Sequence, residues 1–189
     1  MLVSDAKNYV KNLHDQSSVP CMREWFYSGH VEVVVDYVEE ISLKVGADVE
    51  IASLAAIFHD VARVNGVNDD PQLMEDSLDI MRGFLMKYNY PDDSTSHVEE
   101  IIRAHSCRGG AVPDSLEGKV MVTADALAHL MTDFYFILPF RGWWNAGKTF
   151  DDYKNWISEK VERDFSTKIC FDEYKELARD KYEALKVIF

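Results

Sequence analysis

Apolar residues return every three or four positions along most of this 189-residue chain, and this spacing restricts its fold more than any other feature. Such a period places apolar side chains on one face of an α-helix, whereas the alternation typical of strands is rare here. Leu2, Ala6, Val10 and Leu13, for example, share one face of a helix expected over about residues 2–14. The sequence therefore predicts an all-α fold, a compact bundle of several helices.

Glycine, proline and acidic residues indicate where several helices begin and end. Gly46 supplies a stop for the second helix, and Asp48 is a suitable N-cap for the third. Asp70 and Pro71 fit the cap and the first residue of the fourth. The expected helices cover about residues 2–14, 27–45, 71–88, 150–165 and 172–188, with three more around residues 51–58, 101–102 and 120–130.

Two further helix starts are predicted from residue pairs with the spacing of a capping box. Ser96 is followed by Glu99, and Asp114 is followed by Glu117. We therefore expect N-caps at Ser96 and Asp114.

The composition excludes several classes of protein. The chain carries 33 acidic residues against 20 lysines and arginines, a formal net charge of −13, so a nucleic-acid polymer is not an expected partner. Three scattered cysteines argue against a disulfide framework and a thiolate zinc site. No apolar stretch approaches the roughly 18 to 20 residues of a membrane helix, and no secretory leader is recognised, so we expect a cytoplasmic protein without membrane contact.

The most informative motif is the dipeptide His59-Asp60, which ends the most apolar helix expected in the chain, with the sequence Ile-Ala-Ser-Leu-Ala-Ala-Ile-Phe at 51–58. Two strongly polar side chains are costly to bury there unless something pairs with them. A divalent metal ion would supply that pairing, since imidazole nitrogen and carboxylate oxygen suit several such ions. The sequence does not choose among Mn, Zn, Fe, Co, Ni and Mg.

Two further candidate ligands occur on helices of their own. His30 lies in Tyr-Ser-Gly-His-Val at 27–31, and Asp125 lies among alanines and apolar residues in Val-Thr-Ala-Asp-Ala-Leu at 122–127. Either residue alone is more often a hydrogen-bonded structural residue or an ion-pair partner, so neither identifies a site by itself.

The order His, His-Asp, Asp resembles the HD domain superfamily of metal-dependent phosphohydrolases. Four pieces carry the resemblance, at 27–31, 55–63, 101–105 and 122–127, and together they span about residues 25–130. It implies a helical bundle in which one divalent ion is held by His30, His59, Asp60 and Asp125. It also implies that Asp60 orients a metal-bound water. We expect one domain over residues 1–189, with the helices at 150–188 packed on the motif region.

The chemistry of such a site does not depend on the family name. A divalent ion lowers the pKa of its bound water, to about 7 in favourable zinc sites, and can neutralise a phosphoryl oxygen under attack. A phosphate substrate also needs basic donors in so acidic a protein. Arg63 is the first choice for a catalytic and substrate-binding role, one helical turn beyond His59 if that helix continues. His105, Arg108 and Arg141 are further candidates for contact with the substrate.

The sequence also departs from the fuller ligand sets that the family contains. His105 matches one of the additional histidines of members that hold two metals, but the other has no clear counterpart in residues 71–78. A single ion is therefore expected, which argues against a dinuclear-iron oxygenase. In the nucleoside monophosphatase branch a glutamate follows the HD aspartate by three residues, where this chain has Arg63. His129, one turn after Asp125, could brace that carboxylate.

Two principal hypotheses follow. The first is a metal-dependent phosphohydrolase acting on a small phosphorylated substrate, with nucleotides as one class. The second is a regulatory module that binds a metal or a nucleotide without turnover, and the oxygenase is a weaker third. A homo-oligomer is compatible with each of them.

Overall fold

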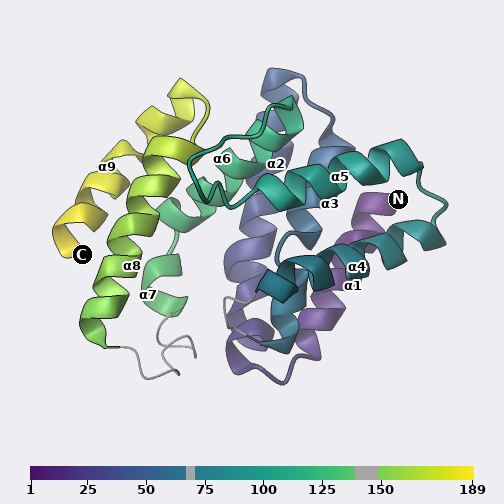
Figure 1. Cartoon of the computed structure of the whole chain (residues 1–189), viewed down its shortest axis with the longest axis horizontal. Helices are drawn as coiled ribbons and strands as arrows, with labels where there is room; N and C mark the ends of the chain where they lie inside the picture. The colour runs from purple at the N-terminus through teal and green to yellow at the C-terminus, as the bar shows by residue number, and fades with distance from the viewer. Residues whose placement is uncertain (67–70, 139–148) are drawn as a thin grey trace.

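The protein is all-helical, as the apolar spacing predicts. The computed structural model describes residues 1–66, 71–138 and 149–189, and within these ranges every regular element is a helix and no strand occurs (Figure 1). The elements are α1 (Leu2–Asp15), η1 (Met22–Val31), α2 (Glu32–Val45), α3 (Val49–Phe58), η2 (Val61–Asn65), α4 (Pro71–Lys87), α5 (Asp92–Ala104), α6 (Leu116–Met131), α7 (Phe134–Leu138), α8 (Phe150–Arg163), η4 (Asp164–Lys168) and α9 (Asp172–Ile188).

The most apolar helix, α3, occupies the centre of the bundle. It packs against α1, α2, α4, α5 and α6, and its residues from Ala52 to Phe58 are all buried. A helix that is apolar on every side can be stable only where neighbours cover every side. The C-terminal end of α3 therefore lies inside the protein, and of the two polar residues that follow it His59 is buried and Asp60 is partly buried.

Helices α2 and α6 connect the two sides of the molecule. They pack on each other and both contact α3, while α6 also contacts η4 and α9. Figure 1 shows α1, α4 and α5 on one side of this pair and α7, α8 and α9 on the other. The C-terminal helices therefore attach to the bundle largely through α6. None of the described helices is both long and apolar enough to cross a membrane.

Several predicted helix ends are confirmed. Gly46 ends α2 in the left-handed region at φ 78°, a conformation that glycine adopts without steric cost. The Asp48 side chain accepts a hydrogen bond from the Ile51 amide and caps α3. Pro71 is the first residue of α4, whereas its expected cap, Asp70, lies outside the described residues.

Both predicted capping boxes are wrong in position. Helix α5 begins at Asp92, just after Pro91, so Ser96 lies inside the helix. The N-cap of α6 is Ser115, whose hydroxyl accepts a hydrogen bond from the Gly118 amide, and not Asp114. A residue pair can have the spacing of a capping box whether or not a helix begins there. Only the backbone geometry decides which side chain reaches a free amide at the start of the helix.

This difference predicts the outcome of two substitutions. Ser115→Ala removes the hydroxyl that caps α6, so we expect a loss of about 1 kcal/mol in the free energy of unfolding. Asp114→Ala, at the neighbouring exposed residue, should change that free energy by less than about 0.5 kcal/mol. Urea unfolding followed by circular dichroism measures both. Equal losses in the two variants would contradict the assignment of Ser115 as the cap.

Candidate metal centre

The four predicted metal ligands converge in the interior. His30 Nε2 lies 3.2 Å from His59 Nε2 and 3.4 Å from Asp125 Oδ1. His59 Nε2 lies 3.8 Å from Asp125 Oδ1 and 3.8 Å from Asp60 Oδ2. Atoms bound to one ion at about 2.1 Å stand roughly 3.0 to 3.5 Å apart, so these spacings are close to those of a common coordination sphere.

His30 is held by a widened turn of helix. It is the penultimate residue of the π-helical segment η1, which continues directly into α2, and its side chain is buried. Such segments occur frequently at functional sites, because the extra residue in the turn redirects a side chain. The preceding Gly29 allows the indole of Trp25 to lie against the backbone, since a Cβ there would come within 2.3 Å of Trp25 Nε1.

His59 follows the last residue of α3 and presents one defined nitrogen to the cluster. Its Nδ1 lies 2.7 Å from the carbonyl oxygen of Ala56, to which it donates a hydrogen bond. The proton is therefore on Nδ1, and the lone pair is on Nε2, the atom that faces His30 and Asp125. This is the arrangement that metal-binding histidines usually adopt.

Asp125 lies within α6, and its two carboxylate oxygens have different partners. Oδ1 faces the histidines, while Oδ2 forms an ion pair with the ammonium group of Lys168, which is buried. Burial acts to raise the pKa of Asp125, but His129, Lys168 and His30 outweigh it and hold the pKa well below its usual value. The carboxylate is therefore charged at neutral pH.

Asp60 carries an ion pair with Arg63, at 2.8 Å between Asp60 Oδ2 and Arg63 Nε. The condition that would place Arg63 one helical turn beyond His59 is not met, because α3 ends at Phe58 and Val61–Asn65 form a separate 3₁₀ turn. That turn folds Arg63 back onto Asp60. Burial acts to raise the pKa of Asp60, yet Arg63 and the nearby histidines hold it well below its usual value.

Three of the four residues predicted to contact the substrate line one pocket, and the fourth lies outside the described residues. His105 lines the same pocket, its ring centroid lies 5.2 Å from that of His59, and its Nδ1 is 2.6 Å from the carbonyl oxygen of Ile102. Burial, with His59 nearby, lowers the pKa of His105 to about 4, so its imidazole is neutral at pH 7. Arg63 and Arg108 also line the pocket, whereas Arg141 lies outside the described residues.

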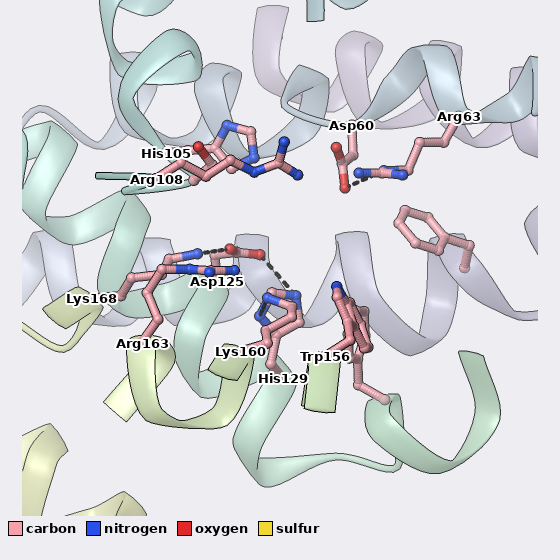
Figure 2. A pocket seen from close by; sticks show the side chains of 13 residues that line it. Asp60, Arg63, His105, Arg108, Asp125, His129, Trp156, Lys160, Arg163 and Lys168 are labelled. Carbon is pink, nitrogen blue, oxygen red and sulfur yellow. Dashed lines mark hydrogen bonds and ion pairs between the residues drawn. The ribbon is translucent and has the colours of Figure 1, made fainter. Parts of the chain in front are cut away.

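Besides the predicted residues, the pocket is lined by three basic side chains that the sequence did not single out. Its volume is about 80 Å³, and His129 and Asp125 face Asp60 and His105 across it (Figure 2). Three basic side chains from α8 and η4 complete its wall: Lys160, Arg163 and Lys168. Lys160, Asp164 and Lys168 recur at intervals of four, which places them on one helix face, but such a charged face normally lies in solvent. Only the packing of η4 on α6 buries it.

The buried donor set fits a divalent ion. Imidazole nitrogens and carboxylate oxygens meet at one place. Among the described residues two groups could hold an ion: His30, His59 and Asp60, and His30, Asp125 and His129. Both groups include His30, and His30 Nε2 is the atom that faces His59 and Asp125. The fold and this cluster define the class as an all-α protein with a group of histidines and aspartates that could hold a metal ion.

Comparison with known proteins identifies the family. The HD domain model matches residues 27–130, so the chain belongs to the HD domain family, whose members bind divalent metals and are in general phosphohydrolases. Two crystal structures of Bacillus subtilis YpgQ share the fold. The selenomethionine form has 20% identity and a TM-score of 0.68 over 99% of this chain and 92% of that one. The complex with ADP has 22% identity and a TM-score of 0.64 over 100% and 94%. Among curated proteins, none matches the sequence.

Proposed function

We propose that this protein is a metal-dependent phosphohydrolase that acts on a small phosphorylated substrate of the nucleotide class. One observation carries the proposal: the histidine and aspartate cluster shares its pocket with five basic side chains, although the whole chain has a net charge of −13. These residues are Arg63, Arg108, Lys160, Arg163 and Lys168. A concentration of positive charge beside a metal centre in an acidic protein favours an anionic substrate.

Arg163 is the basic residue best suited to bind a phosphate group. Lys168 and Lys160 form ion pairs with Asp125 and Asp164 respectively. Arg163 Nε, by contrast, is buried and has no hydrogen-bond partner among the described residues. A guanidinium group can donate two parallel hydrogen bonds to one phosphate. Figure 2 shows Arg163 and Arg108 extending into the pocket from opposite sides.

In this proposal His30, His59, Asp60 and Asp125 hold the ion, which when bound supplies an acidified water and a Lewis acid for the phosphoryl group. Asp60 orients the attacking water. Its Oδ2 is paired with Arg63 Nε at 2.8 Å. Arg63 thereby fixes the carboxylate and keeps it charged, while the remaining basic side chains bind the phosphate oxygens.

Two observations support a nucleotide as the substrate class. YpgQ, which has the same fold, was crystallised with ADP. The pocket of this chain also has aromatic side chains in its wall, namely Phe26, Phe134 and Trp156, which offer apolar surface to a base or ribose.

Metal-stimulated release of phosphate tests the proposal. Protein freed of metal with a chelator is assayed on nucleoside mono-, di- and triphosphates, with Mn, Co, Ni, Zn, Fe(II) or Mg added in turn. We expect release of phosphate or pyrophosphate only when an ion is added, and its loss on renewed chelation. If no ion supports release from any substrate in the panel, the proposed activity is wrong.

Arg163 provides a separate prediction about the substrate. Arg163→Met should raise KM by about 10- to 100-fold with a smaller effect on kcat, because a charge-assisted hydrogen bond contributes roughly 1.5 to 3 kcal/mol. Steady-state kinetics on the best nucleotide measure this change. Arg179→Met, at an arginine on α9 that pairs with Glu176, is the matched control and should leave KM unchanged. An unchanged KM in Arg163→Met would remove this residue from the binding site.

A second candidate function is a module that binds a nucleotide and metal without turnover. The ion pair between Arg63 and Asp60 favours it, because the arginine occupies one oxygen of the carboxylate that would orient water. Isothermal titration with ADP in the presence of each metal distinguishes the two functions. Micromolar binding without release of phosphate in the assay above would favour the binding module.

A further inference from the structure

His129 lies beside the predicted ligands although the four-residue motif does not include it. It follows Asp125 by one turn of α6, is buried, and its ring stacks on that of His30 with centroids 4.9 Å apart and planes 6° apart. Its Nε2 is 3.3 Å from Asp125 Oδ1. The ligand atoms of His30, Asp125 and His129 all lie within 4.8 Å of one another.

The other nitrogen of His129 is held by a buried carboxylate. Nδ1 lies 2.9 Å from Asp164 Oδ2, and Asp164 is fully buried. Lys160 Nζ lies 3.0 Å from the same Nδ1 and 3.1 Å from Asp164 Oδ2. An ionised carboxylate can only accept hydrogen bonds, so both His129 Nδ1 and Lys160 donate to Asp164. The hydroxyl of Tyr135 donates to the same oxygen at 2.5 Å and fixes the carboxylate further.

This arrangement leaves a lone pair on His129 Nε2 that faces Asp125 Oδ1 at 3.3 Å. Two acceptor atoms at that distance repel each other unless a positive charge lies beside both. Asp125 Oδ1 also stands 3.4 Å from His30 Nε2 and 3.8 Å from His59 Nε2. Lys168 holds Asp125 Oδ2, so Oδ1 is the oxygen directed at the three imidazoles. Figure 2 shows Asp125 between Lys168 and His129.

We propose that His129 Nε2 is a fifth protein ligand of the metal centre and that Asp164 is the carboxylate that orients it. A histidine that binds a metal usually donates its other N–H to a carboxylate or a carbonyl, as His129 does to Asp164. The inference rests on the proposed function, since it presupposes an ion at this centre. It extends that site beyond the HD motif, because Asp164 belongs to η4, outside residues 27–130.

A fifth ligand has a consequence for the choice of metal. Three imidazole nitrogens and two carboxylate oxygens exceed the four positions of tetrahedral zinc and leave one position of an octahedron for water or substrate. The site should therefore prefer Mn²⁺, Fe²⁺, Co²⁺ or Ni²⁺ in six-coordinate geometry.

Pulsed electron paramagnetic resonance on the Mn²⁺-loaded protein tests the inference by counting coordinated imidazoles, without reference to activity. We expect three in the wild type and two in His129→Gln. Titration calorimetry should show Mn²⁺ affinity falling by at least about 100-fold in His129→Gln and by about 10- to 100-fold in Asp164→Asn. His97→Gln, at a histidine that pairs with Glu117 outside the cluster, should change neither measurement.

The outcomes separate this inference from the proposed function. Two coordinated imidazoles in the wild type would overturn it and would identify His129 as a protonated brace of Asp125, while leaving the metal centre intact. No coordinated imidazole in the wild type would overturn both. Because the wild-type count decides between two and three, the test does not depend on the folding of His129→Gln.

Discussion

Replacing His59 with alanine is expected to lower metal-stimulated phosphate release by about 1000-fold. The variant loses the Nε2 lone pair that faces His30 and Asp125, and with it an ion that contributes several kcal/mol to transition-state stabilisation. Asp60→Ala should have a similar effect, because it removes both a ligand and the group proposed to orient water. Release of phosphate at saturating metal and nucleotide measures both variants.

The controls for these variants address folding and specificity. The helical circular-dichroism signal of His59→Ala should survive, since the substitution falls at the end of α3 and leaves its apolar residues unchanged. His97→Ala should retain wild-type activity, because His97 lies outside the pocket lining. Full activity in folded His59→Ala or Asp60→Ala would show that the hydrolytic site lies elsewhere.

Replacing Lys168 with methionine is expected to cost about 3 to 5 kcal/mol in the free energy of unfolding of the metal-free protein. The Lys168 ammonium is buried and pairs with Asp125, and its Nζ is 3.8 Å from Asp164 Oδ1. Methionine fills similar volume but leaves both carboxylates without this cation. Removing one partner of a buried ion pair destabilises a protein strongly, because the remaining charge stays buried without compensation. Replacing both partners by well-packed apolar residues costs far less.

Urea unfolding at pH 7.5 measures this loss. Lys181→Met, at an exposed lysine on α9, is the matched control and should change the free energy of unfolding by less than about 0.5 kcal/mol. A loss below about 1 kcal/mol in Lys168→Met would mean that the Asp125 carboxylate is not held by this lysine, since exposed pairs contribute only that much.

Much of the site could be predicted from local sequence. His59-Asp60 stands out because it ends an apolar helix, and the order of His30, His59-Asp60 and Asp125 indicates the HD family, which the family model confirms. Their role as ligands stays a prediction. The convergence of their side chains follows from the packing of α2, α3 and α6 on one another.

The C-terminal part of the site gave no such signal. Lys160, Asp164 and Lys168 look like an ordinary solvated helix face, because charged residues on a buried helix face have the same spacing as those on an exposed one. The capping residues show the same limit on a smaller scale, since Asp114 and Ser115 are both good caps and only the backbone path selects one.

The sequence by itself determined the helical class, the central position of α3 and the membership of the HD family. Each of these depends on periodicity or on a motif. Residues three to four apart lie on the same face of a helix whatever the neighbouring helices are, so the apolar pattern can be recognised from the sequence. Only the tertiary structure decided that Arg63 folds back on Asp60, that Lys168 holds Asp125 and that Asp164 holds His129. The pair of Arg63 with Asp60 depends on the end of helix α3 at Phe58, and the other two pairs depend on the contact of η4 with α6. The local spacing of residues specifies neither feature.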